Sequence, residues 1–442
     1  MSPKAIAQVV PGVAAQSESA ARILRSQEEA EAYVASVCFK HGPPRLLGVE
    51  LEWLLGNRSR PADPLDTQVL RTALGPYTPT SLDPRSAPAT LPAGSQVTVE
   101  PGGQVELASK PQADLQSLVG AVQADSALLH TRLAEQGLYP HQAAADPLRP
   151  PRRILRTARY TAMEAAFDRL GTVGRSMMCS TAAVQPSVDL GERADLALRW
   201  QAVHLLGPVL VAAFANSPLL HGRRTGWKSS RMSVWLALDP PRTAPPELSD
   251  TDPAAGYARR VMQAEVICLR RSEESWLAPP GIRFADWFSG ALPGLPSTAD
   301  LDLHLSTMFP PVRPHGHVEV RYIDAQPGDE WVAPVAVLAA LLSDRAVTSA
   351  AVDACLPVAG QWVVGARDGL ADPAIARAAI RVFELAVQAL PGLIGPGPVR
   401  RLVEEVVLRR VLRGRCPADA DHNHNHTDNN HTAYDDARGG TR

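Results

Sequence analysis

Three short segments of the chain alternate apolar residues with charged ones. The segments are RLLGVELEWLLG (45–56), VTVEPGGQVELAS (97–109) and HVEVRY (317–322). Successive side chains of a β-strand point to opposite faces of the sheet, so this alternation predicts strands with one apolar and one polar face. Because an antiparallel sheet can bury one face and leave the other open, we expect an α+β fold built around such a sheet.

The second segment predicts a β-hairpin around Pro101–Gly103. With a three-residue connection, Glu100 pairs with Gln104 and Thr98 pairs with Glu106, so both glutamates point to the same face. A register shifted by one residue would place them on opposite faces. The register therefore decides whether the two carboxylates meet.

Five glutamates from the three segments would then share one face of the sheet. Glu50 and Glu52 are two residues apart in one strand, so their Cα atoms lie roughly 6.6 Å from each other. Like charges this close are tolerated when cations are bound or when the pKa values of the carboxyl groups are raised. Oxygen ligands favour Mg²⁺ or Mn²⁺, which commonly bridge carboxylates to phosphates. The candidate metal ligands are Glu50, Glu52, Glu100, Glu106 and Glu319.

Arginines accompany the acids and point to anionic substrates. RTARYTAM (156–163) and GWKSSRMSVW (226–235) contain arginine, and Arg313 and Arg321 lie on either side of Glu319. The planar guanidinium group suits carboxylates and phosphates. A strand face that bears Glu or Arg is usually only the solvated side of an antiparallel sheet, and each segment alone favours that interpretation. The three segments together favour a shared site.

Composition limits the classes of partner. The formal net charge of −2 gives no electrostatic reason to expect nucleic acid or an anionic membrane as a partner. With 45% hydrophobic and 20% charged residues, the chain is expected to be globular and to bury a large core. The sequence shows no signal peptide and no run of about 18 apolar residues, and its five cysteines form no Cys-x-x-Cys pair. These features predict a cytoplasmic protein with reduced thiols.

A single catalytic domain is expected over residues 19–417, between a flexible N-terminus (1–18) and a disordered tail (418–442) rich in His, Asn and Asp. Tail histidines could bind Ni²⁺ or Zn²⁺, although a flexible tail of low affinity is the simpler interpretation; they are His422, His424, His426 and His431. Apolar residues at helical spacing predict helices at 26–39, 113–137, 194–218, 332–343, 372–390 and 398–414. Proline-rich stretches predict loops at 145–153, 239–253 and 309–316.

Several common catalytic motifs are missing from the sequence. It contains no Gly-x-x-x-x-Gly-Lys-Ser/Thr loop, no Gly-x-Gly-x-x-Gly turn after a strand, no His-Glu-x-x-His and no Gly-x-Ser-x-Gly. P-loop ATPases, Rossmann dehydrogenases, zinc peptidases of that type and α/β-hydrolases therefore lose support. Nucleotide binding through a metal and a sheet stays open.

Six segments together resemble the glutamate–cysteine ligases of the plant and actinobacterial type. They are GVELEW, VTVEPGGQVELAS, MMCSTAAVQPSVDLG (177–191), FANSPLLHGRRTGWKSSRMSVW (214–235), FADWFSG (284–290) and FPPVRPHGHVEVRYIDAQP (309–327). The resemblance implies a glutamine-synthetase-like fold, in which a curved antiparallel sheet forms a funnel flanked by helices. It also implies an ATP-dependent ligase that joins L-glutamate to L-cysteine through a γ-glutamyl phosphate, in the branch that serves ergothioneine biosynthesis.

Carried over residue by residue, the resemblance implies a role for each candidate. The five glutamates match ligands of Mg²⁺, with Mn²⁺ as the alternative ion. The catalytic residues are then Arg321 and Arg231; the substrate contacts are Arg159, Gln185, Arg231 and Trp235; and the ATP contacts are Arg313 and Arg321.

Two features leave alternatives open. Pro186 and Ser187 depart from the family's Val-Gln-Val-Asn-Leu-Asp pattern, and Pro186 removes a backbone donor, which puts the contacts of the strand at 184–189 in doubt. The sequence also does not resolve the acceptor pocket. A carboxylate–amine ligase with another amine acceptor, or a non-catalytic relative that binds glutamate or metal, therefore stays possible.

Overall fold

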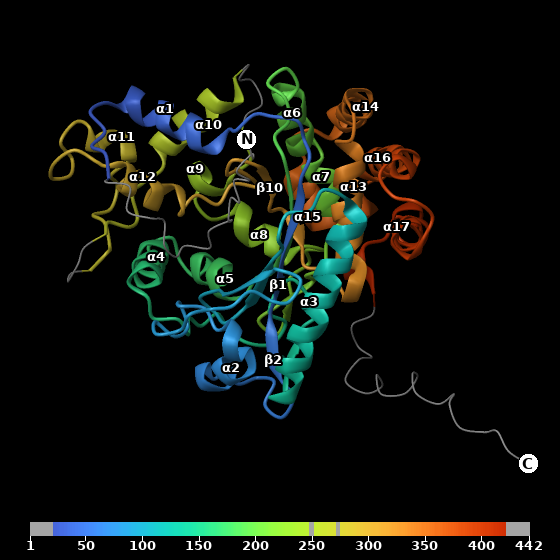
Figure 1. Cartoon of the computed structure of the whole chain (residues 1–442), viewed down its shortest axis with the longest axis horizontal. Coiled ribbons are helices and arrows are strands. Elements are labelled where there is room, and N and C mark those ends of the chain that lie inside the picture. The colour runs from blue at the N-terminus through green and yellow to red at the C-terminus, as the bar shows by residue number, and fades with distance from the viewer. Residues whose placement is uncertain (1–20, 247–251, 271–274, 421–442) are drawn as a thin grey trace, which may run out of the picture.

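The computed structural model describes residues 21–246, 252–270 and 275–420, and its centre is a seven-stranded sheet (Figure 1). Six strands follow the order β3-β4-β1-β6-β10-β9, and β11 pairs with β6. The strands are β1 (Leu47–Trp53), β3 (Gln96–Val99), β4 (Val105–Ala108), β6 (Ala183–Val188), β9 (Val312–Pro314), β10 (Val318–Val320) and β11 (Ile323–Asp324). Their pairings are antiparallel. The predicted α+β class with a central antiparallel sheet is confirmed.

Two small antiparallel sheets lie apart from this one. They consist of β2 (Leu55–Asn57) with β5 (Leu138–Pro140), and of β7 (Leu219–Leu220) with β8 (Arg223–Arg224). The segment at 45–56 is therefore two strands, because the chain leaves the central sheet after Trp53 and pairs with β5 instead.

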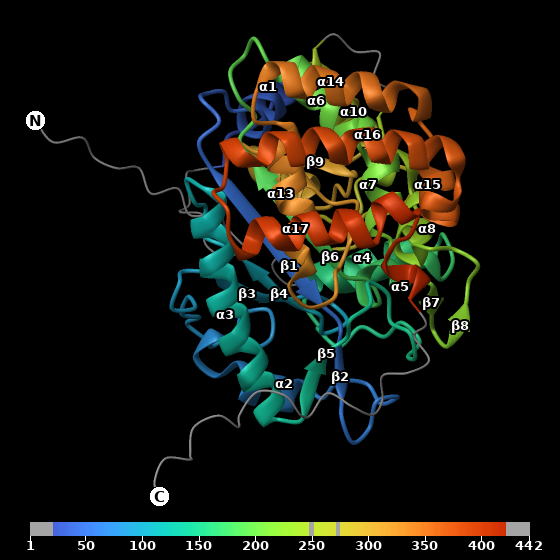
Figure 2. The same ribbon diagram turned by 90° about the vertical axis from the view of Figure 1, so that its right-hand side faces the viewer.

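Helices cover both sides of the central sheet (Figures 1 and 2). The layer on the right of Figure 1, which faces the viewer in Figure 2, contains α3 (Leu115–Glu135), α6 (Leu196–Leu205), α7 (Gly207–Phe214), α13 (Val332–Leu341), α14 (Arg345–Cys355), α15 (Trp362–Asp368), α16 (Pro373–Ala389) and α17 (Pro398–Arg409). The opposite layer contains α1 (Gln27–Cys38), α4 (Ala158–Asp168), α5 (Val173–Cys179), α8 (Ser230–Leu236), α9 (Pro240–Thr243), α10 (Pro253–Gln263), α11 (Phe284–Trp287) and α12 (Thr298–Leu305). Helix α2 (Thr67–Leu74) packs against α3.

Short 3-10 helices connect several of these elements. They are η1 (Gly75–Tyr77), η2 (Gly328–Trp331), η3 (Leu356–Val358), η4 (Gly369–Ala371), η5 (Leu390–Gly392), η6 (Val411–Arg413) and η7 (Pro417–Asp419).

The two faces of the sheet differ as the alternation predicts. Val49 and Leu51 of β1 are 2% exposed and Leu107 of β4 is 0% exposed. This apolar face packs against the first layer, where α3 contacts β1 and α13 contacts β6. Apolar burial stabilises by about 25 cal/mol per Å², and a slip of one residue would turn these side chains away from the core. The apolar face therefore fixes which residues point to the opposite side.

Pro186 is accommodated within β6, although this strand lies inside the sheet. Val49 pairs with Pro186, yet it makes its hydrogen bonds on the other side, where its N–H donates to the hydroxyl of Ser109 and its carbonyl accepts from the N–H of Ser109. The missing donor of Pro186 therefore faces β10 and β11. There the hydrogen-bond ladder is interrupted. Glu319 pairs with Ser187 and Ile323 pairs with Val184, so the chain from β10 to β11 contains one residue more than the matching part of β6. A bulge of this kind leaves residues unpaired, so the proline costs no ladder bond.

The prediction of one helix over 194–218 is wrong in its continuity. The chain forms α6 and α7, which bend by 41° at the break between them. Pro208 lies in the first turn of α7, where no helical hydrogen bond needs its missing N–H. The same proline cannot continue α6, so the preceding helix ends there. Gly207 allows close packing at this bend, because a Cβ there would lie 1.9 Å from the ring of Trp362.

Within the described residues, no single helix is long and apolar enough to cross a membrane. Two bent pairs meet the length and composition test together, namely α6 with α7 and η2–α13 with α14–η3. Every residue of α7 and of α13 is buried in the core, as expected of central helices in a folded domain.

The other five predicted helices form, as α1, α3, α13, α16 and α17. The predicted loop at 309–316 is wrong in part, because Val312–Pro314 forms the edge strand β9. Proline is tolerated there since an edge strand leaves one row of its backbone groups unpaired. The predicted loop at 239–253 contains the one-turn helix α9.

The last described residues pack against the domain. Ala418 is 7% exposed, and its N–H donates to the carbonyl of Ala215 at 2.9 Å. Asp419 forms an ion pair with Lys228, the residue before the N-cap of α8. The predicted N-terminus 1–18 and the tail histidines lie outside the described residues. The first residues assigned to the tail thus contact the segment that leads into α8.

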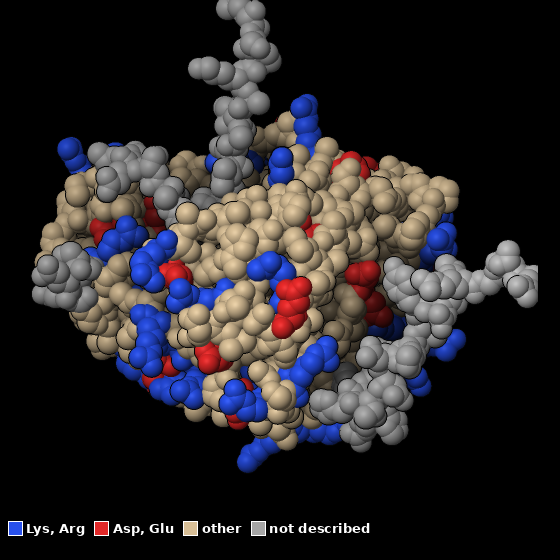
Figure 3. Space-filling view, turned by 60° about the horizontal axis from the view of Figure 1, so that its bottom comes forward, with Lys and Arg blue, Asp and Glu red and all other residues tan. Residues whose placement is uncertain are grey.

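Charged groups of both signs are scattered over the face shown in Figure 3, among many uncharged residues. This distribution agrees with the small net charge of the chain.

Candidate active site

The polar face of the sheet carries predicted residues side by side. The register pairs Glu52 with Glu106 and Glu50 with Gln185, across β1, β4 and β6. Thr98 of β3 lies opposite Glu106. Cross-strand partners share a face and have Cβ atoms about 5 Å apart. The structure thus brings together carboxylates from two strands, with the predicted orientation.

The hairpin has the predicted register. The N–H of Glu100 donates to the carbonyl of Gln104 at 2.8 Å, and the N–H of Gly103 donates to the carbonyl of Glu100 at 2.8 Å. Gly103 has a φ of 93°, which residues other than glycine rarely adopt. Gly102 is needed for another reason, because a Cβ there would lie 2.3 Å from the carbonyl oxygen of Cys179. The turn therefore packs directly against the end of α5.

Gln104 anchors this hairpin and was noted in the sequence only as the partner of Glu100. Its side chain is buried, and Nε2 donates to the carbonyls of Thr181 at 3.0 Å and Met178 at 3.3 Å. Its Oε1 accepts from the N–H of Gly102 at 3.0 Å. The glutamine thereby ties the turn of the hairpin to the segment from the end of α5 to Thr181.

Gln185 joins the two acids of β1. Its Nε2 group donates to Glu52 Oε1 at 2.9 Å and to Glu50 Oε2 at 3.3 Å. The N–H of Ala183 donates to the other oxygen of Glu52 at 2.8 Å. Burial raises the pKa of Glu52 to about 7, and the carboxylate of Glu100 adds to the effect. Burial and neighbouring carboxylates also raise the pKa of Glu50 well above its usual value.

Glu106 shares this environment. Burial, together with the Glu100 and Glu52 carboxylates, raises the pKa of Glu106 to about 8, although the hydroxyl of Thr98 opposes the shift by donating a hydrogen bond at 2.8 Å. Burial likewise raises the pKa of Glu100, against the opposing charge of Arg159. A cation bound among these acids would favour their ionised forms and oppose the effect of burial.

Glu319 differs from the other four acids. It is 1% exposed, and Arg313 donates to it through Nε at 2.9 Å and through Nη2 at 2.7 Å. Arg321 donates to the same carboxylate through Nη1. Burial acts to raise the pKa of Glu319, but the two guanidinium groups outweigh it and hold the pKa at about 2. In this structure Glu319 therefore holds together the two arginines expected to contact ATP.

Helix α8 supplies Arg231 and Trp235, which are four residues apart and so lie on one side of the helix. The guanidinium carbon of Arg231 lies 5.2 Å from the centroid of the Trp235 ring, and that of Arg321 lies 5.6 Å from it. Arg231 is 1% exposed and donates through Nη2 to the carbonyl of Arg321 at 2.6 Å. One indole thus contacts two predicted catalytic arginines.

Arg159 reaches the site from α4. Its Nη2 donates to the carbonyl of Ser306 at 2.7 Å, and its guanidinium lies 5.3 Å from the ring of Tyr160. Its charge is the strongest of those that oppose the raised pKa of Glu100. Arg159 is therefore associated with the hairpin side of the site.

Five polar atoms of these residues are buried without a hydrogen-bond partner in the described part of the chain. An unsatisfied buried group costs about 1–3 kcal/mol, so a cluster of them points to a polar ligand. The atoms are Arg159 Nε, Gln185 Oε1, Arg231 Nε, Trp235 Nε1 and Arg321 Nε. Four are donors and one is an acceptor, a set that suits a ligand with anionic groups and an amine.

Comparison with known proteins identifies the family. The family model described as Glutamate-cysteine ligase family 2 (GCS2) matches residues 46–433. Glutamate–cysteine ligase EgtA of Mycobacterium tuberculosis is 38% identical over 404 residues, which cover 88% of each chain. Glutamate–cysteine ligase EgtA of Mycolicibacterium smegmatis is 37% identical over 400 residues, which cover 89% of this chain and 90% of the relative. This chain belongs to glutamate–cysteine ligase family 2.

The family inferred from the sequence motifs is confirmed, and the family-2 match includes all candidate site residues. Among solved structures, a glutamate–cysteine ligase from Francisella tularensis in complex with AMP covers 86% of this chain and 84% of its own. Its sequence identity is 13% and the TM-score is 0.49.

The carboxylates of this family-2 member suit a hard divalent cation by their chemistry. Their oxygens are the ligands that Mg²⁺ and Mn²⁺ prefer. Burial raises the pKa of Glu50, Glu52, Glu100 and Glu106, and neighbouring carboxylates add to the effect at Glu50, Glu52 and Glu106. Within residues 21–246, 252–270 and 275–420, no three His, Cys, Asp or Glu side chains converge as a ready-made metal-binding group. The metal role of the five glutamates stays a prediction.

Sequence reasoning missed Asp324, which ends β11. Its buried carboxylate accepts hydrogen bonds from Asn216, Ser217 and Ser229. Alternation along 317–322 predicts nothing for Asp324, because the bulge between β10 and β11 shifts the phase of the strand. The available signal was the cluster of small polar residues in FANSP and KSS.

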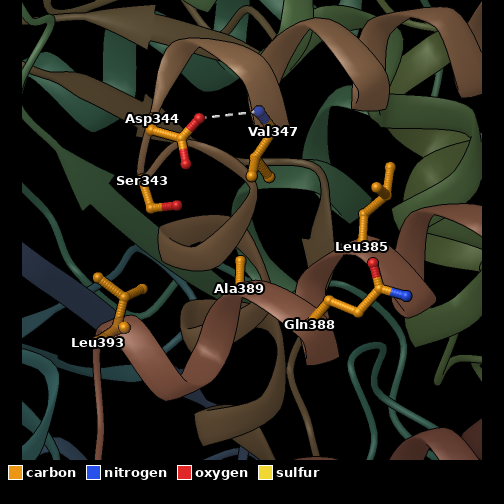
Figure 4. A pocket seen from close by; sticks show the side chains of 8 residues that line it. Ser343, Asp344, Val347, Leu385, Gln388, Ala389 and Leu393 are labelled. Carbon is orange, nitrogen blue, oxygen red and sulfur yellow. Dashed lines mark hydrogen bonds between the residues drawn. The ribbon is translucent and has the colours of Figure 1, made fainter.

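A separate depression lies in the helical layer that covers the apolar face of the sheet, at the end of α16 and the start of α14 (Figure 4). Its only acidic residue, Asp344, already caps α14 by accepting from the N–H groups of Ala346 and Val347. None of the orphaned buried atoms in the described part of the chain belongs to its lining. We therefore place the candidate active site on the sheet.

Proposed function

We propose that this chain is an ATP-dependent glutamate–cysteine ligase that forms γ-glutamylcysteine through a γ-glutamyl phosphate. Family membership supports this proposal, and one structural observation carries it. The unpartnered donors of Arg231, Arg321 and Trp235 lie in the same site as the acidic sheet face. This combination matches a ligand with carboxylates beside a second ligand with phosphates.

The residues divide between the two substrates by their contacts. Arg231 and Trp235 bind the glutamate carboxylate through unpartnered N–H groups, and the free Oε1 of Gln185 accepts from the glutamate ammonium. Arg159 completes this set from the hairpin side. Arg313 and Arg321, already joined by Glu319, contact the phosphates of ATP.

The proposed reaction proceeds in two transfers. A γ-carboxylate oxygen of glutamate attacks the terminal phosphorus of ATP, and ADP leaves. The amine of cysteine then attacks the acyl carbon, the C–N bond forms, phosphate leaves, and the amine releases a proton. Arg321 stabilises negative charge on the transferring phosphoryl group, since preorganised donors are most effective where charge develops.

Glu50, Glu52, Glu100 and Glu106 would hold Mg²⁺, or Mn²⁺ in its place. Glu319 was predicted to join them, but both of its carboxylate oxygens already accept from Arg313 or Arg321, which suits it less to a cation. When bound, the ion neutralises phosphate charge and polarises the phosphorus for attack.

We further propose that the product serves ergothioneine biosynthesis and that the protein works in the cytoplasm. All five cysteines are unpaired and buried, which supports a reducing compartment.

Product analysis tests the proposed function. Purified protein is incubated with ATP, Mg²⁺, glutamate and each of the twenty amino acids as acceptor, and ADP and the peptide product are measured. We expect γ-glutamylcysteine to form fastest and ADP release to depend on glutamate. A faster reaction with another amine would identify a related carboxylate–amine ligase, and ADP release independent of glutamate would refute the acyl-phosphate route.

A further inference from the structure

Asp324 is a buried carboxylate that collects donors from a distant part of the chain. Its Oδ2 accepts from the N–H of Asn216 at 2.8 Å and from the hydroxyl of Ser217 at 2.7 Å. Its Oδ1 accepts from the hydroxyl of Ser229 at 2.9 Å. The side chain is 1% exposed, so no bulk water replaces these donors. Asp324 thus ties the end of α7 and the start of α8 to the sheet.

Two of these donors also build the first turn of α8. The hydroxyl of Ser229 accepts from the N–H of Met232 at 3.1 Å, and the hydroxyl of Ser217 accepts from the N–H of Arg231 at 3.1 Å. The carbonyl of Ser217 accepts from the N–H of Ser230 at 2.9 Å. The first N–H groups of a helix have no partner inside it. Here they are satisfied by two serines whose own hydroxyls are bound to one carboxylate.

The same carboxylate acts on the side chain of Arg231. Nη1 of Arg231 lies 3.7 Å from Asp324 Oδ1, while Nη2 donates to the carbonyl of Arg321 at 2.6 Å. These contacts occupy the two ends of the guanidinium group and leave Nε without a partner. The ring of Trp235 limits its remaining freedom. The orientation of Arg231 is therefore fixed from outside the substrate site.

We propose that Asp324 is a positioning residue for glutamate binding: it sets the start of α8 and the orientation of Arg231 without contacting substrate. The proposal rests on the proposed function, because it takes glutamate as the ligand of Arg231. Asp324 acts on glutamate through Arg231, so replacing Asp324 should weaken glutamate binding more than ATP binding.

The test replaces Asp324 by Asn, which keeps the volume but offers one acceptor oxygen where three donors converge. We expect KM and the calorimetric Kd for glutamate to rise about 10-fold or more, and KM for ATP to change less than about threefold. Such a split reports on glutamate binding rather than on general damage.

Asp125→Asn is the matched control. Asp125 is a buried carboxylate (1% exposed) that accepts from the N–H groups of Ala93 at 2.8 Å and Ser95 at 3.0 Å, outside the site. Both variants should unfold at a lower temperature, but Asp125→Asn should keep the wild-type KM for glutamate. If both variants show the same KM, Asp324 has only a structural role and the proposal is wrong.

A double-mutant cycle with Arg231→Lys tests whether the effect passes through Arg231. Effects that act through one side chain are not additive, so we expect the double variant to bind glutamate about as weakly as the weaker single variant. Full additivity would contradict the proposal.

If Asp324→Asn does not fold, Ser217→Ala decides. It removes one donor to Asp324 and the acceptor for the N–H of Arg231. A rise of about threefold or more in the Kd for glutamate supports the proposal, and an unchanged Kd overturns it. An inactive wild-type protein would instead refute the proposed function.

Discussion

Two glutamates on the same sheet face should respond to the same substitution with opposite signs. Glu106 is surrounded by carboxylates, whereas Glu319 is held between Arg313 and Arg321. We predict that, without metal, Glu106→Gln stabilises the protein at neutral and alkaline pH and that Glu319→Gln destabilises it.

The pKa of Glu106 gives the sign and the limit of the first effect. Burial, helped by the Glu100 and Glu52 carboxylates, raises the pKa from 4.5 to about 8. Between these values the folded chain keeps a proton that the unfolded chain has released, so the free energy of unfolding falls as pH rises through this window. Each pKa unit corresponds to about 1.4 kcal/mol, which sets an upper limit of about 5 kcal/mol. Because Glu106 is partly exposed and its ionisation depends on the charges of the Glu100 and Glu52 carboxylates, we expect about 1–2 kcal/mol at pH 8.

Glu319 has the opposite linkage. Burial opposes its ionisation, but the two guanidinium groups hold its pKa at about 2. A lowered pKa contributes stability that is present above pH 4.5 and is lost as pH falls toward 2. Removing one partner from a buried ion pair costs about 3–5 kcal/mol, since the remaining charges stay buried. Glu319→Gln should therefore lose a few kcal/mol at pH 7.

Urea unfolding in EDTA between pH 5 and pH 9 measures both effects, with Glu135→Gln on the exposed end of α3 as the control. The Glu106→Gln and wild-type midpoints should coincide near pH 5 and separate above pH 7, and Mg²⁺ with ATP should reduce the difference. Parallel pH profiles for wild type and Glu106→Gln would refute the raised pKa. Changes of the same sign in both variants would refute the division of the face into two environments.

Two further predictions concern the hairpin and the C-terminus. Gly102→Ala should lower the melting temperature and the ligase rate, because the added Cβ would lie 2.3 Å from the carbonyl oxygen of Cys179. Gly120→Ala is the control: it lies on an open part of α3 with nothing within 4 Å and should stabilise by about 0.5–1 kcal/mol. Equal melting temperatures for the two variants would contradict the packing argument. Deletion of 421–442 should leave the ligase rate within about twofold of wild type. Deletion of 416–442 should raise KM for glutamate, since it removes the contacts of Ala418 with Ala215 and of Asp419 with Lys228. A tenfold loss of kcat on deletion of 421–442 would show that the tail belongs to the site.

The sequence predicted the parts of the site that depend on strand alternation. Period-2 patterns place Glu50 and Glu52 on the face opposite Val49 and Leu51, because burying the apolar set leaves only one orientation. The hairpin register followed from the length of its turn. These inferences needed only local geometry.

Contacts made by tertiary structure were not accessible in the same way. Pro208 marks the break between α6 and α7 in the sequence, but the close approach of Trp362 to Gly207 at the bend is not encoded in the apolar pattern of the segment. Asp324 was missed because the bulge beside Pro186 shifts the phase of the chain after β10. A pattern within one segment cannot show which partner a distant segment will supply.

The two environments of glutamate on one sheet face also bear on how the proposed substrates would lie. At the β9–β10 edge, one carboxylate balances two guanidinium groups, which leaves positive charge for phosphates. Toward β1 and β4, the hydrogen bonds to the acids come from an amide, a backbone N–H and a hydroxyl, so negative charge there is not balanced by these donors. Cations are then favoured toward β1 and β4, and bare phosphate oxygens toward β9 and β10. A nucleotide with divalent cations on its phosphates fits this face when the cations lie toward β1 and β4 and the phosphate oxygens lie toward β9 and β10. The reversed orientation would place the phosphates against unneutralised carboxylates. The charge gradient across the strands would therefore orient ATP before any residue contacts its base.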